Sequence, residues 1–240
     1  MENDDVTAAD GHRERIVAAA ARLLAEGGAD AVSTRAVSAA AGVQPPTIYR
    51  LFGDKRGLLD AVVAHGFASY LADKTAAAPT DDPVEDLRAG WDLHVGLGLA
   101  NPALYLLMYG QQPPGASSPA ALAAFDVLAG HIRRIAEAGR LRVPEDRAAA
   151  LVHAAGSGAT LALIATPGER RDPELSRAAR EAVLAAITAD APVTPEPGAG
   201  PGAAAAAVTL RAVLPRTDAL TASESALLRE WLDRIAGQAS

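Results

Sequence analysis

The sequence predicts an all-α protein, and three observations lead to this fold class. Apolar residues recur at helical spacing along most of the chain, and no segment shows the alternation typical of a strand. Ala, Leu, Arg and Glu are abundant, and these residues are good helix formers. Aromatic residues make up only 4% of the 240 residues, whereas strands are usually rich in aromatic and β-branched side chains.

Composition and charge narrow the class of protein further. The chain has no cysteine, so disulfides, thiolate zinc sites and cysteine nucleophiles are excluded. We find no apolar run long enough to span a membrane, and the acidic start MENDDVTAAD is unlike a signal peptide. These features predict a cytoplasmic protein without a membrane partner. The net charge is −7, but residues 11–75 hold 8 basic and 6 acidic groups, so the small basic excess lies in one module.

The first helices are expected between residues 12 and 52. Residues 1–11 are expected to be a solvated tail, and a first helix, with Ile16 and Ala20 on its apolar face, ends at the EGG of 26–28. A second helix begins near Ser33, a good N-cap residue, and runs to Gly42. A third, short helix spans roughly 45–51. Prolines suit its first turn, where the N–H groups have no partner inside the helix.

Longer helices follow. Asp54 is expected to cap a fourth helix, with Leu58, Val62, His65 and Leu71 along one face. After a break at 76–83, we expect helices to about 100, from an Asn-Pro restart at 101–102 to 110, and at 119–138, 145–165 and 173–189. The remaining residues form a Pro/Gly-rich linker and C-terminal helices, with Leu227, Leu228, Trp231 and Ile235 as the apolar face of the last one. This gives a tail at 1–11, domains at 12–75 and 76–189, and an extension at 190–240.

The two short helices at 33–52, joined by a tight turn at Gly42, have the spacing of a helix-turn-helix motif. The second helix of such a motif lies in the major groove of DNA, and its N-terminus favours phosphate. Thr47, Tyr49, Arg50 and Lys55 supply side chains suited to phosphate and base contacts.

Residues 12–63 resemble the DNA-binding domain of the TetR family of bacterial transcriptional regulators. The features that carry the resemblance are I-x-x-A-A-x-x-L at 16–23, S/T-x-x-x-V at 33–37, A-G-V at 41–43, T-I-Y at 47–49 and F-x-D-K-x-x-L-L at 52–59. Several motifs at fixed spacing make the resemblance specific, although it covers only the first quarter of the chain. Beyond residue 76 it is weaker, and extends to the all-helical regulatory domains of the same family.

The resemblance implies a role for each matching residue. Thr34 and Arg35 would contact phosphate or a base from the second helix, and Tyr49 and Lys55 would bind phosphate. Arg50 and Leu51 would face the bases, while Ile48 and Phe52 would hold the third helix in the core. The implied DNA-binding set is Thr34, Arg35, Gln44, Pro45, Pro46, Thr47, Tyr49, Arg50, Leu51 and Lys55. Gln44 departs from the Ser or Thr of many members, and Pro45 removes a backbone donor.

The C-terminal part is expected to bind a small-molecule effector and a second copy of the chain. Large side chains gather between the break at 76 and residue 125, and the candidate ligand-binding residues are Trp91, His94, Tyr105, Met108, Tyr109 and Phe125. The same residues could instead fill the core, since buried aromatics usually pack. The resemblance implies a homodimer through 145–165 and 173–189, where the small residues of 154–162 permit close helix approach.

The expected function is a ligand-responsive homodimeric repressor that binds a palindromic, double-stranded DNA operator. No nucleophile–base pair, phosphate loop or carboxylate pair indicates an enzyme, and we expect no cofactor. The three histidines at 94, 131 and 153 lack the spacing of metal ligands, so no metal is expected. The alternative is a small-molecule or protein sensor module without DNA binding. The sequence leaves the effector, the operator, the sign of regulation and the role of 190–240 open.

Overall fold

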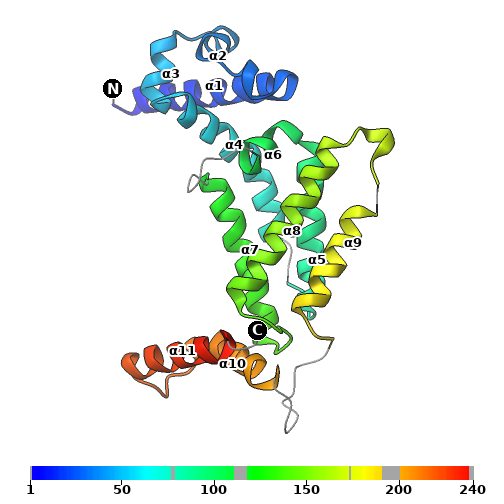
Figure 1. Cartoon of the computed structure of the whole chain (residues 1–240). Helices are drawn as coiled ribbons and strands as arrows, with labels where there is room; N and C mark the ends of the chain where they lie inside the picture. Colours follow the sequence, from blue (N-terminus) through cyan, green and yellow to red (C-terminus); the bar gives the residue numbers. More distant parts are fainter. Residues whose placement is uncertain (1, 77–78, 111–117, 173, 191–200, 238–240) are drawn as a thin grey trace. The chain divides into compact units, whose positions relative to one another are not determined.

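The structure is a computed structural model that describes residues 2–76, 79–110, 118–172, 174–190 and 201–237. These residues form α-helices joined by short connections, with two 3₁₀ turns and one isolated bridge between Leu141 and Thr188 (Figure 1). The all-α prediction is therefore confirmed. The chain divides into two compact units, Met1–Ala77 with Gly96–Ala124, and Ala78–Val95 with Phe125–Ser240.

The first unit is built on four N-terminal helices and a fifth from later in the chain. Its helices are α1 (Glu2–Ala31), α2 (Thr34–Ala41), α3 (Pro45–Phe52), α4 (Lys55–Ala76) and α6 (Pro102–Tyr109). Each of α2, α4 and α6 packs against α1, and α3 packs against α2 and α4. A single apolar core joins them, with Ile16, Val37, Ile48 and Leu58 fully buried. The predicted boundaries at Ser33, Gly42, Pro45 and Ala100 are confirmed.

Three details of this unit differ from the sequence-based expectation. The helix of α1 begins at Glu2, inside the segment expected to be a tail, because its acidic first turn suits a helix N-terminus and the helix-forming Ala8 and Ala9 follow. The backbone then leaves helical geometry at Gly27 and Gly28, as predicted. On α4, His65 is exposed rather than on the inner face, while the side chain of Leu71 lies outside the described residues.

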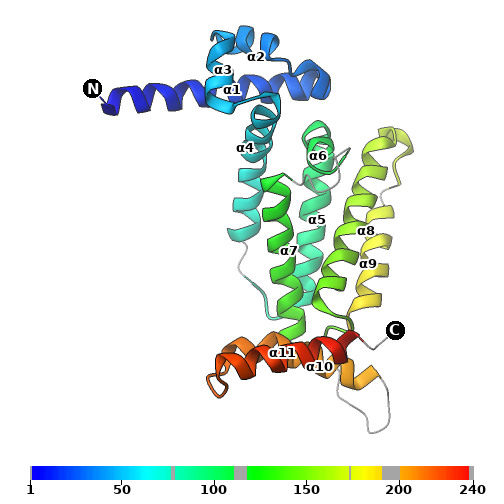
Figure 2. The same cartoon turned by 60° about the vertical axis from the view of Figure 1, so that its left-hand side comes forward.

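The second unit contains the long helices of the C-terminal part. These are most of α5 (Pro83–Ala100), α7 (Pro119–Glu137) from Phe125, α8 (Glu145–Ala165), α9 (Leu175–Ile187), α10 (Pro201–Val213) and α11 (Ala222–Gly237). Helices α8 and α9 lie side by side, as do α10 and α11 (Figures 1 and 2). Ion pairs fasten α5 to its neighbours: Arg88 pairs with Glu181 of α9 at 3.0 Å, and Arg134 of α7 pairs with Asp86.

Two predicted helix faces in this unit are wrong in part. On α7, the helical spacing predicts an inner face of Leu122, Phe125, Leu128 and Ile132 or Ile135. Both isoleucines are buried and Leu128 is half-buried, but Leu122 and Phe125 are exposed. On α11, the expected face was Leu227, Leu228, Trp231 and Ile235. Three of these are exposed, Leu228 is half-buried, and Leu232 and Ala236 face the core instead. The helix has two apolar stripes, and small alanines on α10 pack against the narrower one.

Helix α8 corrects the expectation that no apolar run reaches membrane-spanning length. It has 21 residues and a window of mean hydropathy 1.6, so by length and composition alone it could cross a membrane. Its described environment is that of a core helix, because Ala148, Val152, Ala159 and Leu163 are buried within the unit. A buried core helix passes the same test, so α8 does not indicate a membrane protein.

Candidate nucleic-acid interface

The second helix of the motif is closed at both ends by its own residues. The hydroxyl of Ser33 accepts a hydrogen bond from the backbone N–H of Ala36 at 3.1 Å, which caps the start of α2. At the other end, Gly42 has φ 66° and ψ 37°, a left-handed conformation that glycine adopts without steric cost. The N–H of Val43 donates to the carbonyl of Ser38 at 3.0 Å, so the turn into α3 is fixed by backbone bonds.

Helix α3 divides cleanly into an inner and an outer face. Ile48 is fully buried, whereas Tyr49 keeps 53% of its surface exposed, and Arg50 beside it is exposed as well. The first two helical positions are Pro45 and Pro46, both exposed. A helix start without side-chain cap, followed by an aromatic hydroxyl and a guanidinium, offers polar groups toward solvent along one face.

The junction between α3 and α4 is held by two hydrogen bonds and by a close approach of Gly57 to the backbone of Phe52. Gly53 has φ 79°, and its N–H donates to the carbonyl of Tyr49 at 2.9 Å. The carboxylate of Asp54 accepts from the N–H of Gly57 at 2.8 Å, so it caps α4 as predicted. A β-carbon at Gly57 would lie 2.1 Å from the carbonyl oxygen of Phe52. Only glycine permits this approach, which fixes where α3 ends and α4 begins.

Arg13 of α1 secures the C-terminal end of α3. Its guanidinium donates a hydrogen bond to the carbonyl oxygen of Leu51 at 3.1 Å and lies 4.8 Å from the centre of the Phe52 ring. A cation at a helix C-terminus is favourable, and so is a guanidinium over an aromatic face. From the sequence, Arg13 is expected on a solvated helix face near an arm that could reach a DNA backbone. Its contact with α3 could not be predicted, because Leu51 lies 38 residues away and no local pattern marks it.

The predicted DNA-binding residues belong to one unit and to one run of elements, from α2 to the start of α4. Lys55 is the first residue of α4, and its Nζ donates a long, 3.4 Å hydrogen bond to the carbonyl of Ala29 while remaining exposed. Such a weak bond leaves the ammonium group available to an anion. The exposed members of the predicted set are Arg35, Gln44, Pro45, Pro46, Tyr49, Arg50 and Lys55, and the half-buried ones are Thr34, Thr47 and Leu51.

Leu51 differs from the other predicted residues. Its side chain packs against the apolar core of the unit together with Phe52, rather than pointing freely to solvent. The spacing explains this, because residues 48, 51 and 52 share the inner face of a helix. The side chain of Leu51 is half-buried against the core, and its contact with the bases stays a prediction.

Of the six candidate ligand-binding residues, Trp91, His94 and Phe125 belong to the second unit, and Tyr105, Met108 and Tyr109 belong to the first. The indole N–H of Trp91 donates to the hydroxyl of Ser176 at 3.0 Å, and its ring packs on Gly156. The ring of Phe125 meets that of His153 edge-on at 5.6 Å, and burial lowers the pKa of His153.

In the first unit, Tyr105 and Met108 are buried, and the rings of Tyr105 and Tyr109 lie 4.7 Å apart. The two pockets that the structure describes are lined by other residues. Trp91, Tyr105 and Met108 contribute to the buried core, and their contact with a ligand stays a prediction. Within the described residues, no group of three or more His, Asp or Glu side chains could hold a metal ion.

Comparison with known proteins identifies the class. A family profile described as bacterial regulatory proteins, tetR family, matches residues 16–62. This segment contains α2 and α3, with the later part of α1 and the start of α4. No curated protein sequence matches the chain.

Solved structures extend the likeness along the chain. A putative tetR family regulator from Shewanella sp. PV-4 is 19% identical, with a TM-score of 0.58, covering 74% of this chain and 98% of that one. A TetR variant from Acinetobacter baumannii AYE, solved with minocycline, is 22% identical, with a TM-score of 0.54. The match covers 71% of this chain and 90% of that one. A TetR from Streptomyces coelicolor, 20% identical with a TM-score of 0.50, covers 94% of this chain and 88% of its own.

The matched domain and the all-helical fold define a helix-turn-helix DNA-binding regulator. Residues 16–62 therefore carry the DNA-binding domain of the tetR family of bacterial regulatory proteins, and the solved structures share the fold of the longer chain.

Proposed function

We propose that the protein is a homodimeric, ligand-responsive transcriptional repressor of the cytoplasm, and that it binds a palindromic operator through α3 and its flanking residues. The observation that carries the DNA-binding role is the outer face of α3. There Tyr49 and Arg50 are exposed, while Ile48 anchors the helix in the core. In the proposed complex Tyr49 and Lys55 bind phosphate, Thr34 and Arg35 contact the backbone from α2, and Arg50 reads a base.

The proposed dimer interface lies on the exposed faces of α8 and α9. Along α8 the exposed or half-buried residues Leu151, Ala154, Gly158 and Ala162 recur at helical spacing, and Leu175 of α9 is also exposed. These side chains are apolar or absent, so a second copy of the same surface could approach closely and bury them. A twofold dimer would present two α3 helices, and their spacing must match half-sites about 34–36 Å apart.

Ligand response would act through this spacing. A molecule that binds better when the two α3 helices are wrongly spaced lowers operator affinity by linkage. The minocycline complex of the Acinetobacter baumannii relative shows a protein of similar fold with a small molecule bound. Of the six residues expected from the sequence, Phe125 is the one we retain as a candidate contact, together with His153 beside it, because Phe125 is exposed.

Selection of bound sequences from random double-stranded DNA tests the proposal, because the method does not require the operator sequence to be specified. Enrichment of a palindrome by the wild-type protein, and its loss in the double variant Tyr49→Phe, Lys55→Ala, would support the assignment. A dimeric, folded protein that enriches no sequence would favour the alternative, a sensor module without DNA binding.

A further inference from the structure

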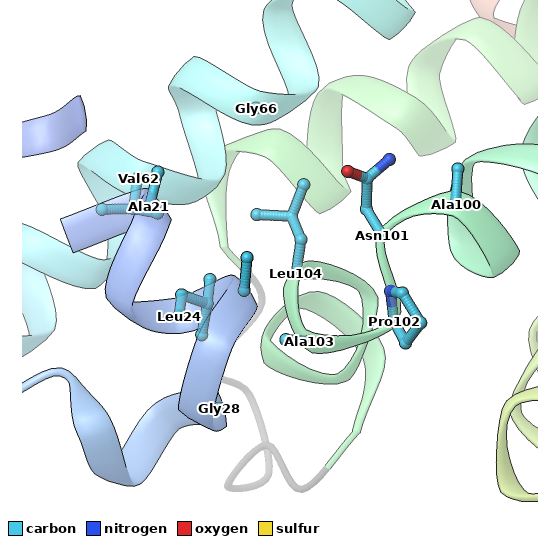
Figure 3. Close-up of a pocket in the computed structure, with 11 residues that line it drawn as sticks. Ala21, Leu24, Gly28, Val62, Gly66, Ala100, Asn101, Pro102, Ala103 and Leu104 are labelled. Atoms are coloured by element: carbon cyan, nitrogen blue, oxygen red, sulfur yellow. The ribbon is translucent and has the colours of Figure 1, made fainter. Parts of the chain in front are cut away.

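An open pocket in the first unit lies where α1, α4 and the start of α6 meet (Figure 3). Its volume is about 330 Å³, near the lower end of the range of about 300–1,000 Å³ that is usual for small-molecule sites. The lining residues come from one compact unit and include Leu24, Ala25, Val62, Gly66, Asn101 and Leu104.

The pocket has an apolar floor and an exposed rim. Leu24, Val62 and Leu104 are buried and belong to the core of the unit, whereas Ala25 and Asn101 at the edge are exposed. Figure 3 shows Leu104 of α6 projecting between α4 and α1. The pocket is therefore reachable from solvent, yet a ligand within it would cover apolar side chains, which is the composition expected of a small-molecule site.

Asn101 supplies the polar group of the lining. Its Nδ2 donates to the carbonyl of Leu97 at 3.3 Å, and it does not cap α6, although it precedes Pro102. Among the described residues no group donates to its Oδ1, so this oxygen is free to accept a hydrogen bond from a ligand. This lining suits a compact, mostly apolar ligand with one hydrogen-bond donor.

The same helices that line the pocket also hold the DNA-binding surface. Helix α4 begins at Lys55 and contributes Val62 and Gly66 to the lining, while α1 carries Arg13, which bonds to the end of α3. The approach of α6 to α4 is already tight, because a β-carbon at Gly66 would lie 2.8 Å from a methyl group of Leu104. A molecule in this pocket would contact Leu104, the side chain through which α6 packs closely on α4.

We propose that this pocket is an effector site for a small, mostly apolar molecule with one hydrogen-bond donor, and that its occupation changes the affinity of the protein for DNA. This inference rests on the proposed regulatory function. It adds a site whose lining includes none of the ligand-binding residues expected from the sequence. Coupling of this kind changes affinity by about 5- to 150-fold, and the same factor acts on both ligands.

The test uses the full-length protein and 1-naphthol, which has an apolar double ring and one hydroxyl donor. Calorimetry measures its binding to the wild type, to Ala25→Leu, which fills the pocket from the rim, and to Asn101→Ala. The matched control is Ala18→Leu, the same change at an exposed site of the same helix outside the lining. Leucine is nearly as good a helix former as alanine, so both variants should fold.

We expect Ala25→Leu to weaken 1-naphthol binding by at least about tenfold, since added carbon atoms in a pocket of this size exclude part of the ligand. Asn101→Ala should weaken it by roughly three- to tenfold through the lost hydrogen bond, and Ala18→Leu should leave it unchanged. In the wild type, saturating 1-naphthol should change the affinity for DNA selected in vitro by at least about fivefold.

Two results would overturn the site. One is that 1-naphthol does not bind the wild type up to its solubility limit, and the other is that Ala25→Leu and Ala18→Leu bind 1-naphthol with equal affinity. Binding at the pocket without any change in DNA affinity would overturn the regulatory role. Absence of DNA binding in every state would defeat the proposed function instead, while the three calorimetric comparisons would still decide whether the pocket binds.

Discussion

Tyr49 and Lys55 are the residues whose removal tests the DNA contacts most simply. Both are exposed and neither holds the core, so Tyr49→Phe and Lys55→Ala should leave the free energy of unfolding almost unchanged. Because both would bind phosphate, affinity should fall for all DNA sequences. Lys55→Ala should also reduce the slope of log affinity against log salt by about one. Fluorescence anisotropy over a salt series measures this, with the exposed Arg22→Ala as the control. An unchanged slope would remove Lys55 from the interface.

Arg13 has a predicted effect on stability as well as on binding. Arg13→Ala removes the hydrogen bond to Leu51 and the contact with the Phe52 ring, so α3 should loosen. We expect the free energy of unfolding to fall by about 1 kcal/mol, since both contacts are at the surface. DNA affinity should fall too. Urea unfolding of Arg13→Ala and of Arg15→Ala, an exposed neighbour without a described contact, gives the comparison. Equal losses in both would contradict the role of Arg13.

These residues mark the limit of what sequence can predict about the site. The T-I-Y and F-x-D-K motifs predicted Tyr49 and Lys55, because the family spacing carries their roles. Arg13 has no such signal, since its contact depends on how α1 meets α3 in three dimensions. Leu51 was assigned to the bases from its position in the motif, and only the structure shows that its side chain also packs partly against the core.

At the scale of the element, the α3–α4 junction depends on Gly57. In Gly57→Ala the new β-carbon would meet the carbonyl oxygen of Phe52, which is backbone and cannot move aside without shifting α3. We expect a loss of about 1–3 kcal/mol in the free energy of unfolding, typical of overpacking. Gly130→Ala on α7 is the matched control, because a β-carbon there meets nothing within 4 Å, and it should stabilise by roughly 0.5–1 kcal/mol. Thermal unfolding of both variants tests this; an unaffected Gly57→Ala would contradict the tight junction.

The ion pair between α5 and α9 makes stability depend on pH. The hydrogen bond from Arg88 lowers the pKa of Glu181 below its ordinary value of 4.5, although burial opposes the shift and Arg180 adds to it. A carboxylate with a lowered pKa stabilises the fold above pH 4.5, and this contribution disappears as pH falls through the native pKa. Glu181→Gln should therefore cost about 0.5–1 kcal/mol at pH 7, a modest value because both side chains are partly exposed.

Denaturant titrations at pH 7 and at about pH 3 measure the difference between wild type and Glu181→Gln. The cost should shrink at the lower pH, which lies below the ordinary pKa of 4.5, because the unfolded state then takes up a proton at Glu181 more readily than the folded state does. Glu169→Gln is a control, because Glu169 has no ion pair among the described residues. A cost that stays constant across this range would show that the charge of Glu181 does not hold α5 to α9.

The helices were predictable where capping chemistry is local, and less so where packing decides. Ser33, Gly42 and Asp54 act at the helix ends where the sequence predicted them, because a cap needs only its own turn. The inner face of α11 was not predictable. Its sequence holds two apolar stripes, and α10 selects the one with Leu232 and Ala236, leaving Trp231 exposed.

At the scale of the whole molecule, binding to a palindromic operator requires a dimer. Leu151→Glu places a charge in the proposed α8 interface, at a residue that is 42% exposed in the single chain. We expect the variant to become monomeric and to lose operator affinity while its helices stay folded. Leu227→Glu on α11 makes the same change at a residue 45% exposed and should remain dimeric. Sedimentation equilibrium decides between them, and a dimeric Leu151→Glu would place the interface elsewhere.

A footprint of the purified protein on the DNA flanking its own coding region, repeated over a salt series, tests the central claim most directly. The account predicts a protected palindrome with half-sites about 34–36 Å apart. Its affinity should fall steeply with salt, and less steeply for Lys55→Ala. Protection of the same palindrome with equal affinity at every salt concentration would contradict the phosphate-binding surface described for α3 and α4.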